Sequence, residues 1–189
     1  MSTRHPVLSL AALVTAPVLA LGVGVVAPVQ ASDETTTTTV SSALTEEQAA
    51  DLTFSRDEER MALELWTLFD DVYGHETDVF GNIAESEAEH FAAIGDKLDQ
   101  YDLPDPSDGM DSDEYTDPAI QALYDDWEAR GLTSLEDAFQ VGVELETVDI
   151  RDLEAKIAKD NPADIEQVYI NLCEGSYSHL AAFTEAVEQ

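Results

Sequence analysis

The chain has 189 residues, of which 44% are hydrophobic and 26% charged, and it carries 41 Asp and Glu against 8 Lys and Arg. This length is enough for one packed domain plus a targeting segment. The formal net charge of −33 repels nucleic acids and anionic lipid at long range, which excludes nucleic acid as a partner. Because the acids are spread over all segments, the charge favours a surface adapted to concentrated salt over a cation-handling one.

Residues 1–31 predict a secretory signal peptide. Arg4 precedes an apolar run over residues 7–26, and Val29-Gln30-Ala31 has the small-residue exit of a cleavage site. We therefore expect cleavage after Ala31, a secreted or extracytoplasmic mature protein, and no membrane insertion after cleavage. The alternative is an uncleaved N-terminal membrane anchor, since the run approaches the roughly 20 residues that span a bilayer. The prolines of this segment favour cleavage.

Residues 32–43 include five consecutive threonines at positions 35–39, which predict a disordered Thr/Ser-rich tether. The folded part is expected to cover residues 44–189. Cys173 is the one cysteine of the chain, so it cannot form an intramolecular disulfide and is expected to be buried as a small apolar residue.

The pattern from residue 44 onward is helical almost throughout. Apolar residues at three- and four-residue spacing predict five helices, at about 45–73, 78–101, 118–130, 134–160 and 162–187. Capping signals mark the ends: the capping-box pairs Thr45–Gln48 and Thr133–Glu136, Gly74 after the first helix, Asp117-Pro118 before the third, and Asn161-Pro162 between the last two.

A long acidic connection separates the first two helices from the last two. Each pair predicts an antiparallel hairpin, and bundles with one long crossover have the ferritin-like arrangement. The expected fold class is therefore all-α, a ferritin-like four-helix bundle whose crossover contains a short helix. Within the crossover, residues 105–114 are rich in Asp but lack EF-hand spacing, so we expect a solvated acidic loop rather than a calcium site.

Several ionisable residues lie on the apolar faces of these helices, where a charge requires a partner. Glu59 is in line with Ala62 and Trp66, whereas Glu87 and His90 form a Glu-x-x-His pair on the stripe of Ile94. The later helices repeat the pattern with three more candidates, which are Glu146, Asp149 and His179.

A register calculation predicts that these residues meet, because facing residues of an antiparallel hairpin have numbers that average to its turn. Glu59 averages with Glu87 and His90 to 73–75, at the Gly74 turn, and Glu146 averages with His179 to 162.5, beside the second break. Both sets then lie roughly 22–25 Å from their turns, at 1.5 Å rise per residue. Two hairpins packed side by side would place four carboxylates and two imidazoles at one level.

Two divalent cations would compensate these four carboxylates, whose burial is otherwise strongly unfavourable. Carboxylate and imidazole ligands suit iron or manganese. The sequence therefore predicts a two-metal site whose candidate ligands are Glu59, Glu87, His90, Glu146, Asp149 and His179. Its open coordination positions would take oxygen or peroxide, with oxidation of ferrous iron or reduction of peroxide as candidate reactions.

The chain resembles the ferritin-like domains of the DUF2202 family over residues 44–187. The resemblance rests on six segments: Asp57-Glu58-Glu59-Arg60-Met61-Ala62, Leu103-Pro104-Asp105-Pro106, Tyr115-Thr116-Asp117-Pro118, Val141-Gly142, Glu146-Thr147-Val148-Asp149-Ile150-Arg151-Asp152-Leu153, and Gly175-Ser176-Tyr177-Ser178-His179-Leu180. The first helix also resembles rubrerythrin around Glu59, which favours Glu59 over Glu58 as the ligand. The ferritin-like pattern implies Glu-x-x-His on the last helix, where this chain has Ser176.

Two alternatives remain open. Asp149 substitutes for the missing carboxylate, or the site is weaker, mononuclear or lost and the domain is a redox-inactive structural or binding module at the cell surface. The polar residues would then form satisfied hydrogen bonds rather than bind metal. No serine elbow, partnered cysteine or phosphate-binding loop supports a hydrolase or kinase.

Overall fold

The computed structural model describes residues 43–189, so the predicted signal peptide and nearly all of the tether lie outside the described residues. The described chain is all-α and contains no strand. It forms five helices, which are α1 (Glu46–Tyr73), α2 (Val79–Gln100), α3 (Pro118–Gly131), α4 (Leu135–Ile157) and α5 (Ala163–Val187). Within residues 43–189, none of these helices has the length and apolar content needed to cross a membrane.

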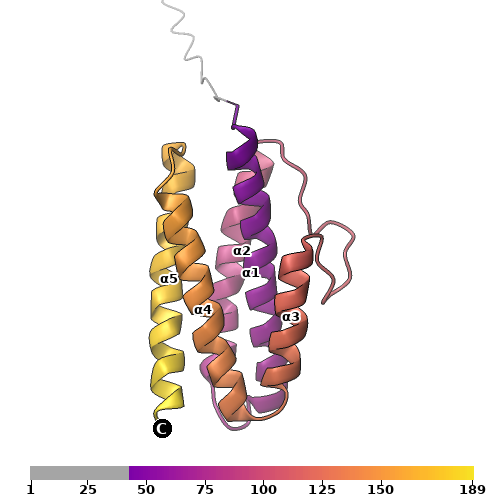
Figure 1. The fold of residues 1–189 in the computed structure, drawn as a ribbon, viewed down its shortest axis with the longest axis vertical. Coiled ribbons are helices and arrows are strands. Elements are labelled where there is room, and N and C mark those ends of the chain that lie inside the picture. Colours follow the sequence, from indigo (N-terminus) through magenta and orange to yellow (C-terminus); the bar gives the residue numbers. More distant parts are fainter. Residues whose placement is uncertain (1–42) are drawn as a thin grey trace, which may run out of the picture. The chain divides into compact units, whose positions relative to one another are not determined.

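The four long helices form two hairpins, α1 with α2 and α4 with α5 (Figure 1). The hairpins touch through α2 against α5 and through α1 against α4, whereas the short helix α3 packs on α4 and α1. The crossover after α2 passes alongside α1 and leads back to α3 (Figure 1). Each long helix therefore faces a common interior, and α3 covers the seam between α1 and α4.

Two buried arginines of α1 hold the acidic crossover in place. Arg56 binds the Asp105 carboxylate at 2.8 Å and lies over the Phe91 ring. Arg60 donates to the carbonyl oxygens of Glu114 and Asp111, at 3.0 and 2.6 Å. The segment predicted as a solvated loop is thus fastened to α1 by charge-assisted hydrogen bonds.

The helix ends agree with the predicted capping box at Thr45 and Gln48, but the α4 start corrects the Thr133 prediction. Ser134 is the N-cap, and its hydroxyl accepts from the Asp137 amide. The hydroxyl of Thr133 instead donates back to the Ala129 carbonyl, in the last turn of α3. A shift of one position in the start of the helix therefore decides which of the two hydroxyls caps the free amides of the first turn.

α4 also ends at Ile157, three residues before the predicted end near 160. The Asn161 side-chain amide donates to the Lys156 carbonyl at 2.8 Å. This bond satisfies a carbonyl of the last turn that a backbone amide would satisfy if the helix continued. Pro162 then occupies the N-cap position of α5, which has no side-chain capping bond.

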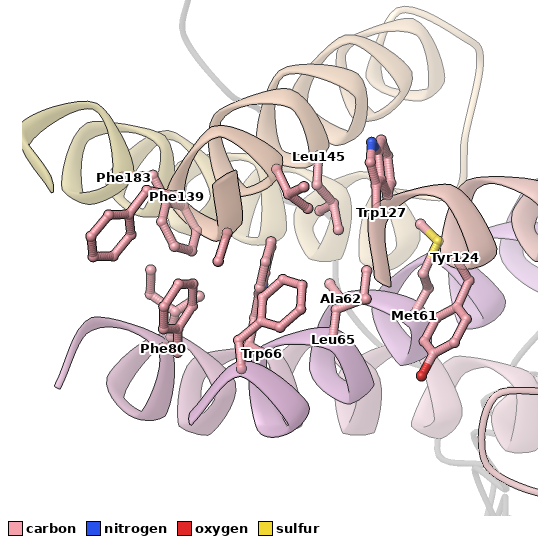
Figure 2. Packing of buried hydrophobic residues seen from close by; sticks show 14 of the residues in the cluster. Met61, Ala62, Leu65, Trp66, Phe80, Tyr124, Trp127, Phe139, Leu145 and Phe183 are labelled. Carbon is pink, nitrogen blue, oxygen red and sulfur yellow. The ribbon is translucent and has the colours of Figure 1, made fainter. Parts of the chain in front are cut away.

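The buried core is divided into two apolar layers. One is aromatic and brings Trp66, Phe80, Phe139 and Phe183 together, with the Trp66 and Phe183 ring centroids 4.8 Å apart (Figure 2). The other is mainly aliphatic and includes Cys173, whose predicted burial is confirmed at 6% exposure. Along every long helix the candidate ligands fall between residues of the two layers, so the interior holds one charged level between two apolar ones.

The capping correction leads to a stability prediction. Ser134→Ala should lower the free energy of unfolding by about 1 kcal/mol, because it removes the acceptor of an α4 first-turn amide. Thr133→Ala is the matched control and should change it by under about 0.5 kcal/mol. Urea unfolding at constant high salt measures both; a larger loss in Thr133→Ala would restore the capping box predicted from the sequence.

Candidate metal centre

The six predicted ligands are all buried at the charged level between the apolar layers. Glu146 is 1% exposed, Glu59 and Glu87 are 2% exposed, and none of the six exceeds 9%. We call this set the carboxylate–histidine layer, and its members are Glu59, Glu87, His90, Glu146, Asp149 and His179. Ionised carboxylates at such burial need a compensating positive charge or a proton.

Five of the six form two groups of three that share Glu87. The first group is Glu59, Glu87 and His90, and the second is Glu87, Glu146 and His179; in each, three candidate ligand atoms lie within 4.8 Å of one another. The two imidazole ring centroids are 5.5 Å apart. Residues from four helices thus lie at neighbouring positions, as hairpin register predicts.

Glu87 faces one histidine with each of its oxygens. Its Oε2 lies 2.9 Å from His90 Nδ1, and its Oε1 lies 2.8 Å from His179 Nδ1. His90 Nδ1 is also 3.4 Å from Glu59 Oε2, and His179 Nδ1 is 3.6 Å from Glu146 Oε2. One carboxylate therefore stands between two nearly equivalent positions, which is the arrangement of a bridging ligand.

Three atoms of the layer lack hydrogen-bond partners although they are buried: Glu59 Oε1, Glu146 Oε1 and His179 Nδ1. For His179 the close approach to Glu87 is an ionic contact without the direction of a hydrogen bond. A buried polar atom without a partner costs about 1–3 kcal/mol, and more when it is charged. Bound cations would satisfy these three atoms together, since all three are of types that bind metal.

Asp149 lies beside the two groups and belongs to neither. Its Oδ2 accepts a hydrogen bond from Ser176 Oγ at 2.6 Å. Ser176 thus occupies the place where a Glu-x-x-His pattern would have a glutamate, and it orients an aspartate from the neighbouring helix α4.

The outer nitrogens of the two histidines lie against two residues that helical periodicity does not mark, Ser86 and Gly175. His179 Nε2 lies 2.9 Å from Ser86 Oγ, which leaves Nδ1 to face the carboxylates. Gly175 makes room for His90, because a Cβ at that position would lie 2.5 Å from His90 Nε2. Ser86 and Gly175 are ordinary residues in an isolated helix, so only the helix that packs against them reveals their role.

Glu58 has a different partner. Its Oε2 accepts from Lys156 Nζ at 2.6 Å, and both side chains are buried between α1 and α4. The structure places Glu59, and not Glu58, with His90 and Glu87. This ion pair was missed, although Lys156 follows Leu153 by three residues on the apolar stripe of α4, a position where a lysine predicts a buried partner.

Burial and mutual contact shift the pKa values in the layer strongly. Burial raises the pKa of Glu59, Glu146 and Glu58 to about 8 and that of Asp149 well above its usual range. Burial also opposes the ionisation of Glu87, but the close contacts with His179 and His90 outweigh it and lower the pKa to about 2. At neutral pH the metal-free layer therefore holds an ionised Glu87 between two imidazolium rings.

The pKa values of both histidines are raised, which matches the lowered pKa of Glu87. Although burial acts to lower them, contacts with Glu59 and Glu87 raise the pKa of His90 to about 11, and contacts with Glu146 and Glu87 raise that of His179 to about 9. Protons thus stand where cations would bind, and binding a divalent ion would release them.

A small cavity of about 10 Å³ adjoins the layer. Its lining residues are Glu58, Glu59, Glu87, Glu146, Asp149, Met61, Ala62, Trp127, Leu145 and Val148. We call it the inner cavity. Its volume corresponds to about one water molecule, so it admits a ligand of only a few atoms.

Three comparisons with known proteins each match about three quarters of the chain. The family model described as "Uncharacterized protein domain (DUF2202)" matches residues 48–189. The uncharacterized protein MJ0754 of Methanocaldococcus jannaschii is 36% identical over 141 residues, covering 74% of this chain and 75% of that protein. The crystal structure of hypothetical protein MJ0754 has a TM-score of 0.73 to this chain at 34% identity, covering 77% of this chain and 82% of that one.

The pKa shifts predict how the metal-free protein responds to pH. The raised values of Glu58, Glu59, Glu146, His90 and His179 all mean that the folded state holds protons more tightly than the unfolded state. Their contribution to stability is present near pH 5 and is lost as pH rises towards about 9. Tm measured with chelator should therefore fall over this range.

General charge repulsion would act in the same direction, so the measurement needs about 2 M KCl, which shortens screening to a few ångströms. In that salt, Glu59→Gln with Glu146→Gln should flatten the Tm profile, because the glutamines cannot ionise. A metal-free Tm that climbs between pH 5 and 8 would contradict the shifted carboxylates.

Proposed function

This chain belongs to the DUF2202 family, and we propose that it is an exported ferritin-like protein that binds two iron or manganese ions in the carboxylate–histidine layer. The observation that carries the proposal is the pair of three-residue groups sharing Glu87, in which three buried atoms, on Glu59, Glu146 and His179, lack a hydrogen-bond partner. Structural hydrogen bonding explains Asp149 with Ser176, but it leaves Glu59 and Glu146 each with an unsatisfied oxygen.

The ferritin-like assignment is supported by topology and by ligand spacing. Two antiparallel hairpins, α1–α2 and α4–α5, are joined by one long connection. Bundles of that kind carry inward-facing Glu and Glu-x-x-His ligands on facing helices. Here Glu59 comes from α1, the Glu87–His90 pair from α2, Glu146 from α4 and His179 from α5.

The ligand chemistry supports iron or manganese. All donor atoms are carboxylate oxygens or imidazole nitrogens, and the thiol of the one cysteine, Cys173, lies in the aliphatic layer. Hard oxygen donors with imidazole suit divalent iron and manganese, whereas thiolate sets favour zinc and iron–sulfur clusters. Six ligands shared between two ions leave coordination positions open for a substrate.

The proposed reaction class is oxidation of ferrous iron or reduction of peroxide. Two bound ferrous ions would each give up one electron and become ferric, and these two electrons would reduce one dioxygen to peroxide or one peroxide to water. The chain's own residues would act by position. Glu87 would hold both ions, Ser86 would orient the His179 ring, and Gly175 would leave room for the His90 ring. The apolar layers would exclude bulk water. A redox-inactive module at the cell surface is the alternative, and it predicts no specific metal.

An exported, salt-adapted protein is part of the proposal. The mature chain would begin after Ala31 and carry the acidic surface into a compartment of high ionic strength, where exposed carboxylates keep a protein hydrated. The secretion of a chain with residues 1–31, and its retention in the cytoplasm without them, would test this part separately.

Metal content tests the proposal directly. Residues 32–189, purified in high salt and loaded anaerobically, should hold close to two iron or manganese ions per chain. Glu87→Ala should lose both ions because Glu87 faces both groups, whereas His90→Ala and His179→Ala should each lose one.

Glu89→Ala is the matched control, since Glu89 is exposed on the same helix and should leave the metal content unchanged. Elemental analysis and the rise of Tm with added metal are the two readouts. A folded wild-type protein with no specific metal would reject the enzyme interpretation and favour the surface module.

The adjacent glutamates of α1 offer a second test. Glu59→Gln should weaken metal binding by about 10- to 100-fold, a loss typical of a changed metal shell. Glu58→Gln should retain both ions, because Glu58 binds Lys156, and should show its effect mainly as altered stability. Equal loss in the two variants would mean that Glu58 also reaches the metal.

A further inference from the structure

The lining of the inner cavity combines two kinds of side chain. Five are carboxylates, and the other five are Met61, Ala62, Leu145, Val148 and Trp127. Neither imidazole borders the cavity, so it meets the layer at its carboxylates. The unpartnered oxygens belong to Glu59 and Glu146, both of which border the cavity.

Trp127 comes from α3, outside the four long helices. The residue is 3% exposed, Figure 2 shows its ring beside Leu145 of α4, and Met61 and Ala62 of α1 line the same cavity. The short crossover helix thus supplies one wall of a cavity that the long helices leave incomplete.

A second hollow lies on the outer side of the same tryptophan. This surface groove of about 470 Å³ runs between α3 and α4 and is bounded by Leu123, Val143 and Thr147 together with Trp127 and Val148. We call it the outer groove. Trp127 and Val148 border both the outer groove and the inner cavity, so these two side chains are what separates the surface from the layer.

An ion pair fastens α3 to α4 beside this barrier. Arg130, one turn after Trp127, donates two hydrogen bonds to the Glu144 carboxylate, at 2.7 and 2.6 Å. Bidentate pairing fixes geometry as well as distance, so it holds the tryptophan against α4.

We infer that Trp127 and Val148 form the entrance through which a small exogenous ligand reaches the carboxylate side of the layer, and that Trp127 determines its size. This inference rests on the proposed metal site. The ligand class is neutral molecules of two or three heavy atoms at most, such as dioxygen and hydrogen peroxide. A cavity near the volume of one water excludes organic hydroperoxides, and the acidic surface disfavours anions.

Nitric oxide, a neutral diatomic ligand of ferrous iron, is the probe for the test. Its association rate with the anaerobic iron-loaded protein, followed by visible absorption, should rise about tenfold in Trp127→Ala and fall about tenfold in Val148→Phe, because gating side chains control access.

Val143→Phe is the matched control: Val143 borders the outer groove but not the inner cavity, so the rate should stay within about twofold of wild type. Imidazole, which is bulkier, should bind the iron of Trp127→Ala only.

Trp127→Phe and Val148→Phe keep the test decisive if Trp127→Ala does not fold, since one widens and the other narrows the entrance with little loss of packing. Iron content is measured for every variant. Unchanged nitric oxide rates in iron-loaded Trp127→Phe and Val148→Phe would overturn the entrance and leave the metal site standing. A wild-type protein that takes up no iron would remove the metal site and the entrance together.

Discussion

Four carboxylates in one buried layer are the constraint on which the rest of the structure depends. Each is at most 9% exposed, and their mutual repulsion adds to the cost of removing them from water. The two histidines can relieve part of that cost as imidazolium ions, and protons on Glu59 and Glu146 can relieve more. Protons thus compensate the layer when no metal is bound, and their exchange for cations would couple metal binding to pH.

The layer also requires the four long helices to be in register. Apolar residues occur on both sides of the charged level in every helix, so a shift of one turn would bury charges in an aromatic or aliphatic layer. The same mismatch would separate Glu87 from its two histidines. The apolar layers and the charged layer therefore specify one packing jointly, which an apolar core alone would do less sharply.

Positive charge is scarce in this chain, and its placement is informative. Of 8 Lys and Arg residues, Arg56, Arg60 and Lys156 are buried. The two arginines fasten the crossover and the lysine neutralises Glu58, so these cations are used for structure. The five other cations are few beside 41 Asp and Glu, so the chain keeps its large negative charge. Anchoring the crossover also positions α3, and with it Trp127, over the seam between α1 and α4.

The sequence by itself determined the elements and much of the layer, because helical periodicity and hairpin register are local or arithmetic properties. Thr45 and Gln48 predicted the start of α1. The averaging of residue numbers predicted that Glu59 would lie near His90 and Glu146 near His179, as the structure has them. Capping was less predictable. Ser134 occupies the N-cap position expected for Thr133, because the backbone of the turn decides which of two neighbouring hydroxyls points at the first-turn amides. What packs across helices was decided by the tertiary structure alone. Ser86, Gly175, the Glu58–Lys156 pair and the wall formed by Trp127 depend on how helices distant in sequence approach, and spacing along one helix carries no record of that approach.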